Sequence, residues 1–300
     1  MFLYHYNKNR FIGGNAVEWC LAYQCRKQYM KVKLYVVGDV HGYYSALIAA
    51  LTKQGWFEDD GPKKLVVCGD MMDRGREALK MQAFMMELLA KDQLIFVRGN
   101  HEDLMLMMLD DILDDFEPFA DYRSYHIRNG TLDTATQLTM FTFPEFIARH
   151  RDFVFKTKQT DFVKTLIPAS VNYFETKNHI FVHGWIPCKH ERVYGLNQYS
   201  FRPDWRLAND EEWNEARWIN GMEAGYLHDV LEDGKTIVCG HWHTSYGHSN
   251  LHKKCSEFGP DAIFDPFIDK GILAVDACTA YSGKVNCVVI EDELLEVENV

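Results

Sequence analysis

Side chains that could bind a metal recur at the ends of short apolar runs along this 300-residue chain. The runs are rich in Val, Ile and Leu, as expected of strands that are buried on both faces. Each ends in a glycine next to one carboxylate, amide or imidazole, and these residues are Asp39, Asp70, Asn100, His183 and His241. Glycine at such places permits positive φ and a close approach of the backbone.

The spacing of these residues predicts how the strands are arranged. Expected strands at 31–39, 63–70 and 93–100 alternate with helical patterns at 43–54 and 76–91, which indicates parallel strand–helix–strand units of about 30 residues. Further strands are expected at 179–184, 235–241, 271–277 and 285–292. The Trp-rich segment 185–234 is expected to be irregular until a helical pattern at about 211–233. Because ligands bind at the carboxyl ends of parallel strands, we expect the five side chains to gather there. His41 and His243, two residues beyond a strand-end residue, reach the same edge.

These seven nitrogen and oxygen donors, with no thiolate among them, suit Mn, Fe, Zn or Mg. Seven donors are too many for one tetrahedral ion. They fit two ions about 3.5–4 Å apart that share a carboxylate, an arrangement that serves in-line displacement at phosphorus by a hydroxide formed near neutral pH. The chain has no G-x-S-x-G or cysteine nucleophile signature, so no covalent phosphoenzyme is expected.

Composition excludes several other classes of protein. Hydrophobic residues make up 47% and charged residues 25%, which is typical of a globular protein and excludes disorder, collagen and coiled coil. The net charge of −11 argues against nucleic-acid binding. No apolar run of about 18 residues or secretory signal is present, so no membrane association is expected. Eight cysteines without a C-x-x-C pair favour reduced thiols and a cytoplasmic location.

Five short motifs then resemble those of the calcineurin-like metallophosphoesterases. They are GDVHG (38–42), GDMMDRG (69–75), RGNHE (98–102), VHG (182–184) and GHWH (240–243). The second and third are most similar to the phosphoprotein phosphatase branch, which includes Ser/Thr protein phosphatases and bacterial diadenosine tetraphosphatases. The resemblance implies an α/β fold, a four-layer α/β/β/α sandwich over 31–292 with a helical cap insertion at 102–178. Residues 1–30 would be an extension of unknown role and 293–300 a tail.

The resemblance also implies a role for each motif residue. Asp39, His41 and Asp70 would bind the first metal, and Asp70, Asn100, His183 and His241 the second. His101 would be the general acid, oriented by Asp73. Arg74, Asn100 and a further arginine would hold the substrate phosphate, Arg74 as a bidentate fork. For that further arginine we favour Arg217 over Arg202 and Arg206.

Two features depart from the branch. His243 gives the G-H-x-H ending of other metallophosphoesterases, in which the second histidine joins the first metal. Ala277 and Cys278 replace an expected Thr-Gly pair after Asp276. Asp276 is expected near the metals, either as a ligand or behind the ligands.

The leading interpretation is a phosphatase of the Ser/Thr protein phosphatase type. It would use two divalent ions, with Mn favoured over Fe or Zn, to hydrolyse a phosphorylated protein or a small phosphoester. The alternative is a dinucleoside polyphosphate hydrolase of the diadenosine tetraphosphate type. Nucleic-acid end processing conflicts with the net charge, and an inactive binding module conflicts with the presence of every expected ligand.

Overall fold

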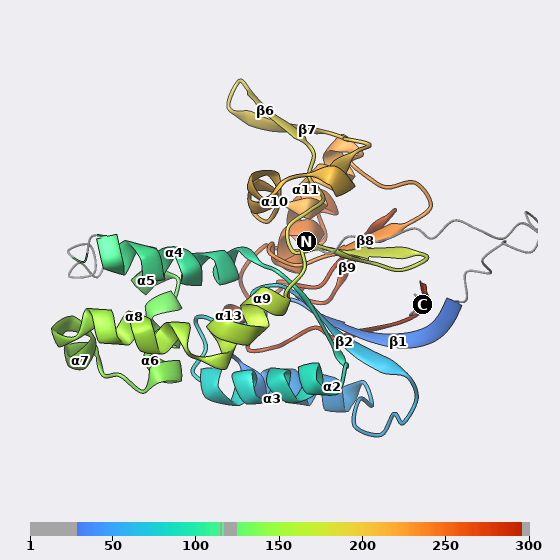
Figure 1. Cartoon of the computed structure of the whole chain (residues 1–300). Helices are drawn as coiled ribbons and strands as arrows, with labels where there is room; N and C mark the ends of the chain where they lie inside the picture. Colours follow the sequence, from blue (N-terminus) through green and yellow to red (C-terminus); the bar gives the residue numbers. More distant parts are fainter. Residues whose placement is uncertain (1–28, 115, 117–124, 296–300) are drawn as a thin grey trace, which may run out of the picture.

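The computed structural model describes residues 29–114, 116 and 125–295 and contains two β-sheets that lie face to face between helices (Figure 1). The first sheet has the order β11-β1-β2-β3. Its strands are β1 (Tyr29–Val37), β2 (Lys63–Cys68), β3 (Leu94–Val97) and β11 (Val288–Leu295). Strands β1, β2 and β3 are parallel, as predicted, and β11 pairs antiparallel with β1. Helices α2 (Tyr44–Lys53) and α3 (Ala78–Ala90) connect the parallel strands.

The second sheet has the order β4-β5-β8-β10-β9. Its strands are β4 (Phe174–Glu175), β5 (His179–Phe181), β8 (Thr236–Cys239), β9 (Phe267–Asp269) and β10 (Ile272–Ala274). Strands β5, β8 and β10 are parallel, and β4 and β9 pair antiparallel at the two edges. The metal-capable strand ends therefore come from two facing sheets and not from one.

Side chains along β1 alternate between two apolar cores, one on each face of the first sheet. Val32, Leu34 and Val36 pack between the two sheets, whereas Tyr35 and Val37 belong to the core on the other face of the first sheet. That second core includes residues of α2 and α3. A third cluster covers the outer face of the second sheet with side chains of α10 (Asp210–Ala216) and α11 (Gly221–His228). Three cores separate four layers, which confirms the predicted α/β/β/α class.

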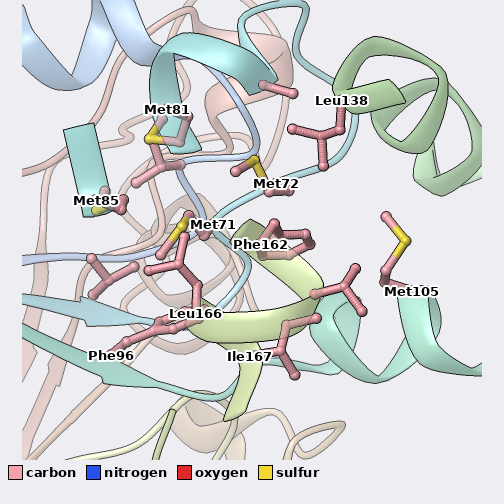
Figure 2. Packing of buried hydrophobic residues seen from close by; sticks show 14 of the residues in the cluster. Met71, Met72, Met81, Met85, Phe96, Met105, Leu138, Phe162, Leu166 and Ile167 are labelled. Carbon is pink, nitrogen blue, oxygen red and sulfur yellow. The ribbon is translucent and has the colours of Figure 1, made fainter. Parts of the chain in front are cut away.

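Helices lie in the stretch for which a helical insertion is expected. They are α4 (Asn100–Asp114), α5 (Tyr125–Arg128), α6 (Thr131–Thr139), α7 (Phe143–Ala148), α8 (His150–Lys158), η2 (Phe162–Leu166) and α9 (Ile167–Ala169). Figure 2 shows Met105, Leu138 and Phe162 from these helices near Met71 and Met72 of the loop after β2. The helices and this loop thus share one apolar core.

The segment 185–234 differs from the sequence expectation. Where irregular chain was expected, β6 (Lys189–Val193) and β7 (Leu196–Ser200) form a hairpin that projects from the body (Figure 1), followed by η3 (Trp205–Leu207). The expected helical stretch 211–233 is two helices, α10 (Asp210–Ala216) and α11 (Gly221–His228). The break has a local cause, because the Asn220 side chain accepts a hydrogen bond from the Glu223 amide and caps a new helix.

Short elements complete the described chain. They are α12 (Thr244–Tyr246), η4 (Gly247–Leu251) and α13 (Thr279–Ser282). Among the described residues, no helix has the length and apolar character needed to cross a membrane. Most of the proposed N-terminal extension, at 1–28, and the end of the proposed tail, at 296–300, lie outside these residues.

Candidate metal centre and catalytic site

The loops at the carboxyl ends of β1 and β2 are tied together by their backbones. The His41 amide donates to the Asp70 carbonyl over 3.0 Å, and the Gly42 amide donates to the Met71 carbonyl over 2.8 Å. Six candidate site residues have positive φ, namely Asp39, His41, Asp70, Asp73, Arg74 and His241. Such backbone is strained for residues other than glycine, and it persists only where the surroundings impose it.

Glycine makes room for the convergence of these loops at two positions. A Cβ added to Gly99 would lie 2.3 Å from Asp70 Oδ1, and one added to Gly69, at φ +80°, would lie 2.4 Å from His183 Nδ1. Neither distance is tolerable for a real side chain. These two glycines therefore let strand ends of both sheets approach one carboxylate.

Two groups of donor atoms meet at Asp70. His41, Asp70 and His101 form one group, and Asp70, His183 and His241 form the other, with the donor atoms of each within 4.8 Å of one another. The Asp70 carboxylate lies 3.8 Å from His41 Nε2 through Oδ2 and 3.3 Å from His183 Nε2 through Oδ1. This all-nitrogen and oxygen donor set, built around a shared carboxylate, fits two divalent cations.

Two other predicted ligands contact these groups. Asp39 Oδ1 accepts a hydrogen bond from the His241 amide over 2.9 Å, and Asn100 Oδ1 lies 2.7 Å from His183 Nε2. Both side chains are buried. Asp39, Asn100, His183 and His241 thus come together around Asp70, although Asp39 does not belong to either of the two closest groups of acidic and histidine donors.

His243 is placed differently. Its Nδ1 accepts a hydrogen bond from the Tyr246 amide over 3.2 Å, and its Nε2 lies 3.3 Å from Glu257 Oε1. Both ring nitrogens therefore have partners away from Asp70, and His243 belongs to neither donor group.

Burial and neighbouring charges set the protonation of the centre. Burial lowers the pKa of His41, His183 and His241, the last to about 3. Burial would raise the pKa of Asp70, but the surrounding imidazoles, His183 foremost, outweigh it and hold that pKa well below its usual range. Neutral imidazoles around an ionised carboxylate are the protonation states that metal binding requires.

Two more buried acids, Asp39 and Asp276, lie near the Asp70 carboxylate. Burial, together with the charges of Asp276 and Asp70, raises the pKa of Asp39. Burial also raises the pKa of Asp276 to about 7, although its Oδ1 accepts a hydrogen bond from the Cys278 amide over 2.7 Å. Bound cations would relieve this repulsion among carboxylates.

His101 lies between the Asp73 carboxylate and the Arg74 guanidinium. Its Nδ1 lies 2.7 Å from Asp73 Oδ2, and its Nε2 lies 3.2 Å from Arg74 Nη2. Burial would lower the pKa of His101, but Asp70 and Asp73 outweigh it and raise that pKa. Arg74 is exposed, whereas His101 and Asp73 are buried. The Asp73–His101 pair can therefore hold a proton beside the Arg74 guanidinium, which is exposed and can bind a phosphate.

Arg217, the favoured second phosphate ligand, is buried and already paired. Its Nη1 donates to Asp103 over 2.8 Å and its Nη2 to Asn172 over 2.5 Å. Its Nε is buried without a hydrogen-bond partner among the described residues. The rivals are also engaged in ion pairs, Arg202 with Asp204 and Glu212, and Arg206 with Glu175 and Glu232.

Comparison with known proteins shows which family the chain belongs to. The model of the calcineurin-like phosphoesterase family matches residues 32–267. The chain belongs to the calcineurin-like phosphoesterases.

Curated relatives match a shorter stretch. Bis(5'-nucleosyl)-tetraphosphatase PrpE [asymmetrical] of Geobacillus sp. (strain WCH70) is 32% identical over 76 residues, 23% of this chain and 31% of the relative. Serine/threonine-protein phosphatase 2 of Salmonella typhimurium is 38% identical over 73 residues, 24% of this chain and 31% of the relative. The phosphoesterase thus matches about a third of the length of these relatives.

Solved structures match over more of the chain but at lower identity. A cold-active protein-tyrosine phosphatase of Shewanella has a TM-score of 0.47 at 17% identity, with 86% of this chain and 75% of that chain covered. A protein serine/threonine phosphatase of Saccharomyces cerevisiae has a TM-score of 0.45 at 15% identity, with 90% and 82% covered.

Some residues that support this site were not identified from the sequence. Glu102 lies within the RGNHE motif, and its carboxylate accepts a hydrogen bond from the Asp70 amide. Its place in the motif was a usable signal. Thr131 and Thr134 of α6 bind Asp73 from a distant part of the chain. No sequence pattern marks these two residues.

Proposed function

We propose that this phosphoesterase hydrolyses phosphomonoesters in the manner of a Ser/Thr protein phosphatase, with two divalent cations of which Mn²⁺ is favoured. The observation that carries the proposal is the buried Asp73–His101 pair beside the exposed Arg74. An alkoxide that leaves from phosphoserine is strongly basic and needs a proton from a general acid. A nucleoside polyphosphate leaves as a stable anion and needs one much less.

The residues divide the work between binding and proton transfer. When bound, the two cations would activate water and neutralise charge on the phosphoryl oxygens. Arg74 binds the phosphate through its guanidinium fork. In the free site Arg74 Nη2 lies 3.2 Å from His101 Nε2 and, as a guanidinium, can only donate to it. Once Arg74 has turned to the phosphate, Nε2 is free to carry a proton, and His101 gives that proton to the leaving oxygen while Asp73 stays ionised and keeps the Nδ1 hydrogen bond that orients the ring.

Two substrates that differ in their leaving group test the proposal. With Mn²⁺, we expect turnover of p-nitrophenyl phosphate that is abolished by Asp70→Asn or by excess chelator. In His101→Asn, hydrolysis of a phosphoserine peptide should fall by about 10²–10⁴-fold, the usual contribution of a general acid. Loss on p-nitrophenyl phosphate, whose leaving group needs little help, should be much smaller. Full activity of Asp70→Asn, or in chelator, would contradict the proposal.

A second candidate is hydrolysis of dinucleoside polyphosphates. It is favoured by the relatives named as bis(5'-nucleosyl)-tetraphosphatases, which are 31–36% identical over the matched stretch. Chromatography after incubation with diadenosine tetraphosphate distinguishes the candidates. A kcat/KM for this substrate well above that for the phosphopeptide would select it, with AMP and ATP as products of asymmetrical cleavage or two ADP of symmetrical cleavage.

A further inference from the structure

Asp73 receives a second hydrogen bond from the cap helices, besides the one from His101. Thr131 Oγ1 lies 2.8 Å from Asp73 Oδ2, the same oxygen that lies 2.7 Å from His101 Nδ1. An ionised carboxylate only accepts, so the threonine hydroxyl must be the donor. Thr131, Asp73 and His101 are all buried, and Asp73 Oδ1 has no hydrogen-bond partner within the described chain.

One face of α6 holds the loop that carries Asp73 and Arg74. The residues at spacing three along this helix, which lie on one face, are Thr131, Thr134 and Gln137. Thr134 Oγ1 accepts from the Asp73 amide over 3.0 Å, and Gln137 Nε2 donates to the Gly75 carbonyl over 3.0 Å. The loop is thus held at its backbone by two of these side chains and at the Asp73 carboxylate by the third.

The helix also starts in close contact with this loop. Gly130, at φ +84°, precedes α6, and a Cβ added there would lie 2.4 Å from the Arg74 amide nitrogen. Asp73 and Arg74 themselves have φ of 74° and 62°. Contacts with α6 therefore help to impose the strained backbone that presents both side chains.

We propose that Thr131 is a positioning residue for proton delivery, which fixes the Asp73 carboxylate and through it the ring of His101. This inference rests on the proposed function, because it assumes that His101 protonates the leaving oxygen. With Oδ2 held by two donors, the carboxylate cannot rotate about its last side-chain bond without losing both. Without the hydroxyl, one donor remains and the imidazole loses part of its orientation.

The test compares Thr131→Val, which keeps the shape and removes the hydroxyl, with Thr131→Ser, which keeps the hydroxyl. We expect Thr131→Val to lower kcat about tenfold on phenyl phosphate or a phosphoserine peptide, a fraction of what a general acid contributes. The loss on p-nitrophenyl phosphate should be much smaller, and KM should stay the same. Thr131→Ser should restore most of the rate.

Matched controls separate positioning from general damage. Thr136→Val, in the same helix, removes a hydroxyl that donates to the Asp133 carbonyl, and it should change neither rate. If Val disturbs packing, Thr131→Ala and Thr131→Ser form a second pair for the same comparison.

Two results would overturn the inference. The first is an equal loss of kcat on both kinds of substrate in Thr131→Val, or no loss on either. If His101→Asn still distinguished the substrates, this result would overturn the inference and the proposed function would stand. If His101→Asn itself failed to distinguish them, the proposed acid and this inference would fall together.

Discussion

The carboxylate of Glu102 is hydrogen-bonded to the backbone of Asp70, the residue shared by both candidate cation groups. Glu102 Oε2 accepts from the amides of Asp70 and Gly99 over 3.0 and 2.8 Å, and Oε1 accepts from the Met71 amide over 3.0 Å. Glu102 is fully buried, and burial raises its pKa to about 7. One side chain thus fixes the loops after β2 and β3 relative to each other.

Substitution Glu102→Gln should weaken this link and the metal centre with it. A glutamine amide can accept on only one of its two ends, so at least one backbone N–H would face an NH₂ group. An unsatisfied buried donor costs about 1–3 kcal/mol, and loss of support behind a metal ligand typically lowers metal affinity about 10–100-fold. Calorimetric titration with Mn²⁺ measures the change. Glu87→Gln, on the exposed face of α3, is the control, and equal Mn²⁺ affinity in both variants would contradict the role of Glu102.

Metal removal should lower the thermal stability of the fold. The buried acids Asp39, Asp70 and Asp276 repel one another, and bound cations offset that repulsion. A ligand that binds only the folded state at a hundredfold excess over its Kd adds about 3 kcal/mol. We therefore expect Mn²⁺ to raise Tm by several degrees over chelator-treated protein, and Asp70→Asn to abolish most of this rise. An identical Tm with and without Mn²⁺ would count against the centre.

Arg217→Ala should destabilise the protein as well as affect substrate binding. The substitution removes hydrogen bonds to Asp103 and Asn172, although Asp103 keeps an ion pair with Arg98 at 2.7 Å. Loss of a buried hydrogen bond to a charged group costs about 1–3 kcal/mol, which urea unfolding would detect. A raised KM at unchanged kcat in the folded variant would support phosphate binding by Arg217. Arg128 is exposed, so Arg128→Ala is the control for the loss of one positive charge.

The sequence signal for the candidate metal ligands is local. A strand, a glycine and a ligand lie next to one another in the chain, and parallel pairing then brings the ligands together. His243 also follows a strand end, but its contacts come from Tyr246 and Glu257, which carry no such signal in the sequence. The link from Thr131 to Asp73 spans 58 residues and joins common residue types. The sequence gives no signal for the β6–β7 hairpin either, because most of its described side chains, apart from the buried Tyr199, are exposed and its strands lack an apolar alternation.

Asp292 should govern stability between about pH 4 and 2, because it joins the two sheets. It lies on β11 of the first sheet and accepts hydrogen bonds from the turn between β4 and β5 of the second sheet and from the first residue of β5. Its donors are Thr176 Oγ1 at 2.6 Å, Asn178 Nδ2 at 2.7 Å and His179 Nδ1 at 2.6 Å. Burial would raise the pKa of Asp292, but hydrogen bonds from His179 and Thr176 outweigh it and lower that pKa from 3.8 to about 2.

A folded pKa below the unfolded one means that the stabilisation is complete above about pH 4 and disappears as pH falls toward 2. The shift corresponds to about 2 kcal/mol. Asp292→Asn should therefore unfold at lower urea at pH 7 and lose less stability than the wild type between pH 4 and 2. Glu291→Gln, at the exposed neighbouring position, should keep the wild-type slope. If Asp292→Asn and the wild type lost stability equally over this range, the junction between the sheets would not depend on the ionised carboxylate.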